Sequence, residues 1–342
     1  MFRLKTIAFS LIIGLGCVIL FFGLDFAYTS LVIPHDTREP GIRHPVYHHS
    51  FRPYFDAVRG WGGRKYRFVT NSLGFADSVP REIPLQTSKR RILFLGDSFT
   101  EGIGYTYPET FVGRFSAMLD PDQYDVLNGA VASYSPRWYY RKLKYHLDRG
   151  LKVDEVFVFI DISDVQDEVF YAHERWRDVA LPYIRSSMER RFLLTLTAMR
   201  LFRSRLSPPP IDYANRANWT SNEDVFQTWG EEGLNLATQH MDQIAELCRL
   251  RGIRLFVAVY PWPAQITRGE RECRQVTHWR EFCRSRQVPF LDLFSVFIDP
   301  SVPDAVTRYY IPGDFHWNTA GNEKVADALH SFWLETSRAI HH

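Results

Sequence analysis

Five short segments dominated by apolar residues recur along the chain, and each is followed by a stretch with the pattern of a helix. Unbroken apolar runs of this length are typical of strands that are buried on both faces of a parallel sheet. The predicted strands are residues 91–95, 124–127, 155–160, 253–259 and 289–291, and the predicted helices are residues 110–119, 136–149, 234–251, 277–286 and 319–336. This alternation predicts an α/β domain with a doubly wound, flavodoxin-like parallel sheet that helices cover on both faces.

The first predicted strand stops at Gly96, and three small polar residues that can cap a helix follow it: Asp97, Ser98 and Thr100. In one interpretation they are ordinary turn residues. A phosphate-binding loop is a second interpretation, but no Gly-Lys-Ser/Thr closes the segment and its glycines do not fit the dinucleotide fingerprint. In the third, Ser98 is a nucleophile, which needs a base and an orienting acid elsewhere in the chain.

Asp314 and His316, two residues apart near the C-terminus, supply both groups. The Gly-Asp-Ser motif and this Asp-x-His motif together resemble the SGNH/GDSL family of serine esterases and acyltransferases, over about residues 90 to 335. The resemblance implies an SGNH hydrolase fold, in which His316 takes the proton from Ser98 and Asp314 orients the imidazole. It implies an enzyme that needs neither a cofactor nor a metal ion.

The resemblance also implies an oxyanion hole, to which the N–H groups of Ser98 and Gly129 would contribute. The family usually adds an asparagine in a Gly-x-Asn-Asp motif, and Ser163 stands at that position here. A hydroxyl can donate one hydrogen bond, so either Ser163 or Asn128 would supply the third donor. Asp164 either lies near the substrate or is a structural carboxylate. Because ligands bind at the carboxyl ends of parallel strands, we expect five residues to line the substrate: Asp97, Asn128, Asp164, Trp262 and Trp317.

The spacing Asp-x-His, in place of the commoner Asp-x-x-His, resembles the membrane-linked acyltransferases that decorate alginate and similar exopolysaccharides. The implied substrate is an acyl ester, most simply an O-acetyl ester, on a carbohydrate or polysaccharide. Hydrolysis and transfer share the acyl-enzyme step and stay open as alternatives. A third alternative is a catalytically inactive glycan-binding or assembly protein on the same fold, with polysaccharide-assembly proteins as partners.

The N-terminus carries an apolar run over residues 7–24, with Arg3 and Lys5 before it. Eighteen residues are enough to cross a bilayer core, and the basic flank predicts a cytoplasmic N-terminus. We expect an uncleaved anchor in the inner membrane, with the catalytic domain on the periplasmic or extracellular side; a cleaved signal peptide is the alternative. Cys17 is either a lipidation site or a thiol buried in the membrane. The formal net charge of +2 gives no sign of nucleic-acid binding.

The predicted organisation is an anchor over residues 1–25, a juxtamembrane linker and lead-in over residues 26–88, and the hydrolase-like domain over residues 89–342, with an insertion at about 165–232. An edge strand is expected at residues 66–70. Histidines 44, 48 and 49, near His35 and Asp36, either bind a metal or belong to a solvated linker. The basic segment 188–205 either rests on a membrane or an anionic polymer, or is a solvated helix face. Cys248 is expected in the core, and Cys273 and Cys283 are expected to pair.

Overall fold

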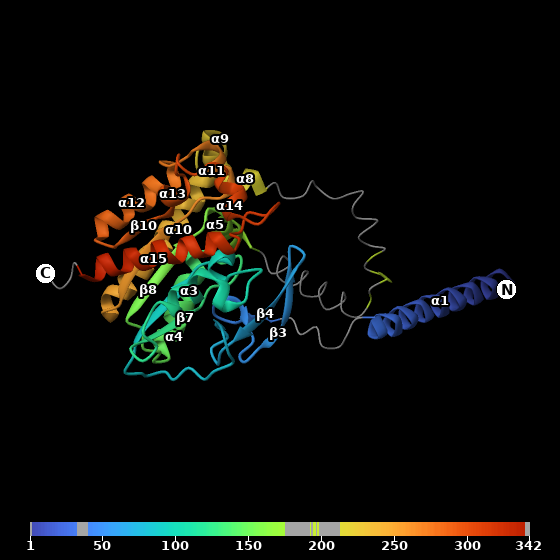
Figure 1. The fold of residues 1–342 in the computed structure, drawn as a ribbon. Coiled ribbons are helices and arrows are strands. Elements are labelled where there is room, and N and C mark those ends of the chain that lie inside the picture. The colour runs from blue at the N-terminus through green and yellow to red at the C-terminus, as the bar shows by residue number, and fades with distance from the viewer. Residues whose placement is uncertain are drawn as a thin grey trace. The chain divides into compact units, whose positions relative to one another are not determined.

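The computed structural model describes residues 2–32, 40–174, 192, 194, 195, 197 and 213–338 (Figure 1). The chain divides into two compact units. One unit consists of Met1–Glu39 and His173–Ile211, and the other of Pro40–Ala172 and Asp212–His342. The basic segment 188–205 with its arginines 190, 191, 200, 203 and 205 lies outside the described residues, apart from the four isolated ones, and so do His35 and Asp36.

Among the described residues of the first unit, Phe2–Val32 form the long helix α1. Its segment Phe9–Leu31 has a mean hydropathy of 2.3 over 23 residues, so by length and composition it can cross a bilayer. The helix continues beyond Asp25, where the predicted anchor ends. Asp25 can lie inside it because its carboxylate accepts hydrogen bonds from the N–H groups of Leu194 and Thr195, at 2.8 Å each.

The second unit is built on an eight-stranded sheet with the order β10-β9-β8-β6-β7-β5-β4-β3. Its strands are β3 (Asp56–Trp61), β4 (Arg64–Thr70), β5 (Ala76–Asp77), β6 (Arg90–Leu95), β7 (Tyr124–Asn128), β8 (Glu155–Ile160), β9 (Arg254–Val259) and β10 (Phe290–Asp292). The five predicted strands are β6 to β10, and they pair in parallel. Their spatial order, second-first-third-fourth-fifth, is the flavodoxin-like order, so the predicted fold class is confirmed.

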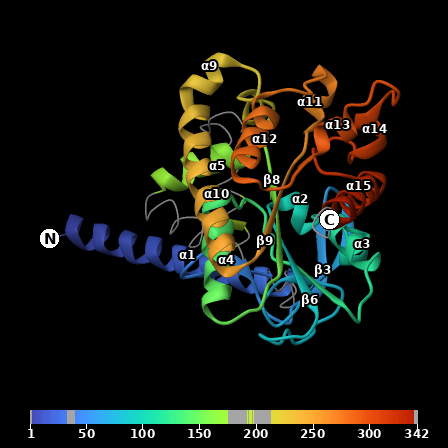
Figure 2. The ribbon, with the colours of Figure 1, turned by 90° about the vertical axis from the view of Figure 1, so that its left-hand side faces the viewer.

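Helices cover both faces of this sheet. They are α2 (Ser98–Glu101), α3 (Phe111–Ala117), α4 (Pro136–Asp148), α5 (Asp164–His173), α8 (Tyr213–Asn218), α9 (Glu223–Val225), α10 (Glu231–Arg251), α11 (Pro263–Arg268), α12 (Arg274–Arg286), α13 (Leu293–Phe297), α14 (Ala305–Tyr309) and α15 (Thr319–Arg338). Helix α4 packs on α10, and α3 packs on α15. Figure 2 shows these two pairs on opposite sides of the strands. The strands between them are accordingly buried: every residue of β8 is inaccessible to solvent.

Residues 40–77 differ from the predicted linker with one edge strand. They form the hairpin of β1 (Gly41–His44) and β2 (His48–Phe51), followed by β3, β4 and β5. The edge of the sheet is β3, and the strand predicted at the edge, β4, lies between β3 and β5. The prolines of this segment, Pro40, Pro45 and Pro53, stand outside these strands, where a missing N–H breaks no ladder, and so they delimit short strands.

The predicted pairing of Cys273 and Cys283 is wrong. Both thiols are free and buried. Cys273 is the N-cap of α12 and Cys283 lies near the other end of that helix, so the rise of about 1.5 Å per residue separates them by roughly 15 Å. A disulfide needs Cα atoms within about 7 Å. Cys248 is buried in α10, as expected, and its thiol is free.

Candidate functional site

Ser98 is the first residue of α2, in the turn that follows β6. Asp97 caps this short helix, because its Oδ1 accepts a hydrogen bond of 3.1 Å from the Phe99 N–H. Gly102 ends the helix at φ 85°, and a Cβ there would lie 2.1 Å from Cγ2 of Thr110. Only glycine fits both the left-handed backbone and the close approach. The Gly-Asp-Ser turn therefore holds Ser98 at the carboxyl end of a central strand.

Ser98, His316 and Asp314 form one hydrogen-bonded series, as the sequence predicts. The Ser98 Oγ lies 2.9 Å from His316 Nε2, and His316 Nδ1 lies 2.7 Å from Asp314 Oδ1. Ser98 and His316 are only 8% and 3% exposed, so water competes little for these hydrogen bonds. A carboxylate that accepts from Nδ1–H leaves the Nε2 lone pair free to accept the serine proton. This is the arrangement that activates a hydroxyl as a nucleophile.

Asp314 has an additional partner that the sequence did not indicate. The Trp61 Nε1–H donates to Asp314 Oδ2 at 2.7 Å, and the His316 N–H donates to Oδ1 at 3.1 Å. Burial raises the pKa of Asp314, but the hydrogen bonds from His316 and then Trp61 outweigh burial and lower it to about 2. The carboxylate therefore stays ionised at neutral pH and can stabilise an imidazolium. Trp61 ends β3, far from Asp314 in sequence, and no local pattern places it here.

Two of the predicted oxyanion donors are already engaged. The Gly129 N–H donates to the Phe94 carbonyl at 2.9 Å, extending the pairing of β7 with β6, so the assignment of Gly129 is wrong. The Asn128 side chain donates to the Thr100 carbonyl at 2.7 Å and accepts from the Ala130 N–H at 3.1 Å, so it is not a free donor either. The Ser163 N–H is also used, by Asp161 Oδ1 at 2.7 Å. Its hydroxyl has no hydrogen bond within the described part of the chain.

The loop after β7, residues 129–133, offers another donor. Its backbone groups are held by four side chains from other segments: Glu101, Lys142, His49 and Tyr171. The Ala132 N–H donates to Glu101 Oε2 at 2.8 Å, and the Val131 N–H donates to the Gly96 carbonyl at 3.3 Å, so the loop lies against the turn that carries Ser98. Among the described residues nothing accepts from the Ser133 N–H, whose residue is exposed at φ 61°.

Lys142, in α4, is the buried cation of this network. Its Nζ donates to the Gly129 carbonyl at 2.7 Å and faces the rings of Tyr47, Phe75 and Tyr134. Burial lowers the pKa of Lys142 to about 7. The side chain thus holds the loop at the cost of desolvating an amine.

Substitution of Lys142 by methionine should remove a pH dependence of stability. In the wild type the folded-state pKa lies below the ordinary value, so the unfolded chain binds more protons between pH 7 and 10, and the free energy of unfolding rises with pH there. The slope is at most about 1.4 kcal/mol per pH unit. Urea denaturation of the full-length protein in detergent, at pH 7.5, 8.5 and 9.5, should show the difference between wild type and variant growing with pH. Parallel pH dependences would contradict the assignment of this slope to Lys142.

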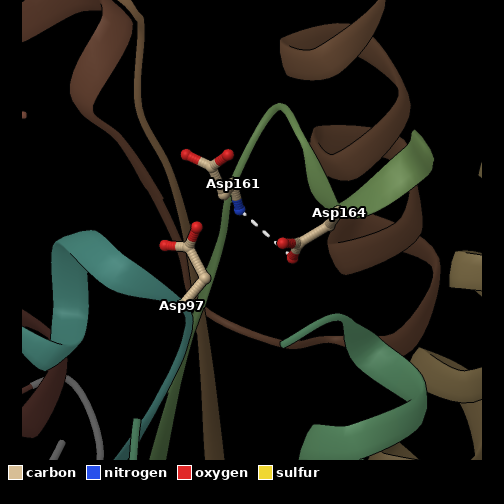
Figure 3. A group of neighbouring side chains, drawn as sticks. All are labelled: Asp97, Asp161 and Asp164. Atoms are coloured by element: carbon tan, nitrogen blue, oxygen red, sulfur yellow. Dashed lines mark hydrogen bonds between the residues drawn. The ribbon is translucent and has the colours of Figure 1, made fainter. Parts of the chain in front are cut away.

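Three buried carboxyl groups converge beside the triad: Asp97, Asp161 and Asp164 (Figure 3). Each offers an oxygen within 4.8 Å of the others, a spacing that could hold a cation. Burial raises the pKa of Asp97 and Asp164 well above the usual range, and the neighbouring carboxylates add to this. Hydrogen-bond donors next to these carboxyl groups stabilise the cluster.

Three aromatic residues supply those donors. The Tyr260 hydroxyl donates to Asp97 at 3.1 Å, the Trp262 Nε1–H to Asp161 at 2.8 Å and the Tyr139 hydroxyl to Asp164 at 2.9 Å. Asp97 also accepts from the Ser98 hydroxyl at 3.2 Å. Asp164 is fully buried under the site, so its predicted place next to the substrate is wrong. Asp97 reaches the site only through Ser98.

A pocket of about 460 Å³ opens beside Asp314. It is lined by Trp61, Trp262, Pro263, Ala264, Gly313, Asp314 and Phe315. The rings of Trp262 and Phe315 stack at 4.5 Å with an interplanar angle of 15°. Trp262 therefore lines this pocket, and its place next to a substrate stays a prediction. Trp317 does not line the pocket: it is 2% exposed, and its ring packs against those of Phe99 and Phe297 in the core.

Comparison with known proteins gives similarities at low identity. No family model and no curated protein matches the chain. Among solved structures, TesA is 11% identical, with a TM-score of 0.43 over 71% of this chain and 97% of its own. A G-D-S-L family lipolytic protein from Veillonella parvula is 9% identical, with a TM-score of 0.41 over 70% of this chain and 95% of its own. Axe2, an acetylxylan esterase from Geobacillus stearothermophilus, is 15% identical, with a TM-score of 0.41 over 72% and 94%. At these values the functional argument rests on the site itself.

Proposed function

We propose that the protein is a serine esterase of the SGNH/GDSL class that cleaves or transfers an acyl group on a carbohydrate. The observation that carries the proposal is the hydrogen-bonded series Ser98–His316–Asp314 at the carboxyl end of the parallel sheet. The nucleophile, the base and the ionised acid are in contact without any rearrangement.

The reaction follows from the geometry. His316 Nε2 accepts the proton of Ser98 as Oγ attacks the ester carbonyl, and Asp314 stabilises the imidazolium that forms. The negative oxygen of the tetrahedral intermediate accepts from the N–H groups of Ser98 and Ser133, with the Ser163 hydroxyl as a further donor. His316 then protonates the departing alcohol, which leaves an acyl group on Ser98. Attack by water completes hydrolysis, and attack by a sugar hydroxyl completes transfer.

The cellular setting is part of the same proposal. Helix α1 anchors the protein in the inner membrane, and Arg3 and Lys5 keep its N-terminus in the cytoplasm. The catalytic unit then faces the periplasm or the exterior, where polysaccharides carry O-acyl groups. Polysaccharide-assembly proteins are the corresponding partners.

A catalytically inactive glycan-binding or assembly protein is the second candidate. The serine at position 163 favours it, because a hydroxyl replaces the longer amide donor expected there, and a lost oxyanion donor costs on the order of 3 kcal/mol. The intact triad favours the enzyme.

Acetate release separates the two candidates. Full-length protein in detergent is incubated with O-acetylated alginate or xylan, and free acetate is followed by NMR. An esterase releases free acetate above the protein-free rate, whereas a transferase moves the acetyl group to a hydroxyl of added unacetylated polysaccharide without an equal release of acetate. Folded protein that releases and transfers no acetate would contradict the enzyme and leave the binding function.

A further inference from the structure

The position of the pocket beside Asp314, relative to Ser98 and His316, indicates which part of an ester would enter it. In acyl transfer from an ester, the oxygen of the departing alcohol must lie near the nitrogen that protonates it, here His316 Nε2. The pocket is lined by the two residues that precede His316 and by Trp61, whose ring meets the imidazole edge to face at 5.4 Å. The acyl carbonyl must face the other way, toward the N–H groups of Ser98 and the loop after β7. The pocket is therefore on the alcohol side of the site.

The pocket walls are mainly aromatic. One wall is the stacked pair of Trp262 and Phe315, and another is Trp61, which is 38% exposed at the end of β3. The N–H of Trp262 is used by Asp161, and that of Trp61 is used by Asp314, so both indoles offer their ring faces rather than their donors. Flat apolar faces around a pocket of about 460 Å³ suit a ring with apolar C–H faces and an outward-pointing polar rim, such as a pyranose.

Trp61 connects this pocket to the triad. The same indole that lines the pocket donates from Nε1 to Asp314 Oδ2 at 2.7 Å. A ligand that packs on Trp61 would hold the end of β3 in place. Through the Trp61 indole it would also hold the Asp314 carboxylate that orients His316.

We propose that this pocket binds the sugar ring that carries the ester, and that Trp61 is both its wall and a positioning residue for Asp314. The catalytic half of this inference rests on the proposed esterase function. The binding half does not, because a ring can occupy the pocket whether or not Ser98 reacts.

Binding is tested first, without catalysis. Full-length Ser98→Ala protein in detergent is titrated with unacetylated xylotetraose by calorimetry. We expect measurable binding that weakens at least tenfold when Trp61→Ala is added. Val58→Ala is the matched control, since Val58 lies on the same strand and is 68% exposed, and it should leave the affinity unchanged. No binding, or equal binding with and without Trp61, would overturn the inference.

Kinetics test the coupling to the triad. With an acetylated methyl xyloside and ethyl acetate as substrates, Trp61→Phe keeps a ring but loses the donor, so kcat should fall severalfold for both esters. Trp61→Ala should in addition raise KM at least tenfold for the sugar ester only. Equal changes in KM for both esters would overturn the pocket assignment. Failure of the wild type to hydrolyse either ester would instead contradict the proposed esterase function, and the binding titration would still decide the pocket.

Discussion

Ser98→Ala should lower kcat/KM for p-nitrophenyl acetate by at least 10³-fold. The variant loses the hydroxyl oxygen that lies 2.9 Å from His316 Nε2, so no acyl-enzyme can form on residue 98. What remains is the background that donors and binding provide, which in well-studied serine hydrolases is several orders of magnitude below the full rate.

The side chain is small and packs in a preformed turn, so the variant should fold as the wild type does. Circular dichroism and thermal unfolding verify this. Ser301→Ala, in an exposed loop, is the matched control and should retain full activity. Equal hydrolysis by the wild type and Ser98→Ala proteins would show that Ser98 is not the nucleophile.

Asp314→Asn should lower kcat by about 10³- to 10⁴-fold with little change in KM. The substituted amide can face His316 Nδ1 with its NH₂ group, which moves the imidazole proton to Nε2 and removes the acceptor for the Ser98 hydroxyl. The amide also lacks the charge that stabilises the imidazolium. Steady-state kinetics on p-nitrophenyl acetate measure both parameters, and a loss confined to KM would contradict the role given to Asp314.

The same variant has a signature in stability. The pKa of Asp314 is lowered to about 2 in the folded protein, so its ionised form contributes stability that is complete above the ordinary pKa near 4 and is lost as the pH falls through 2. The free energies of unfolding of wild type and Asp314→Asn should therefore differ most above pH 5 and converge between pH 4 and 2. A difference that stays constant with pH would mean that Asp314 is not held ionised by its partners.

Much of the fold could be predicted from the sequence, because a strand that is buried on both faces is a continuous run of apolar residues. Residues 156–160 are apolar throughout, whereas a half-exposed strand would alternate apolar and polar residues. The triad could be predicted because the resemblance to a known family pointed to Ser98 and to the Asp-x-His pair.

The antiparallel strands have a weaker sequence pattern than the parallel strands. Strand β3 carries alternating, largely exposed residues, and β1 and β2 are four residues each between prolines and turns. Short, half-exposed strands take their stability from pairing with neighbours rather than from their own pattern, so the sequence suggested a linker.

The details of the site depend on register and on distant contacts. The Gly129 N–H could either continue the pairing of β7 with β6 or face the ligand. Its hydrogen bond to the Phe94 carbonyl decides for the pairing, and composition does not reveal that bond. Trp61 contacts Asp314 because the antiparallel strands extend the sheet and place the Trp61 indole next to the site.

Covalent labelling tests the central claim most directly, because it asks whether His316 activates Ser98 in the folded protein. The full-length protein is treated with a fluorophosphonate, and the adduct is located by mass spectrometry of its peptides. A single adduct on Ser98 is predicted, with a labelling rate that falls at least 10³-fold in His316→Ala. An adduct on another residue, or a rate on Ser98 that does not depend on His316, would contradict the account.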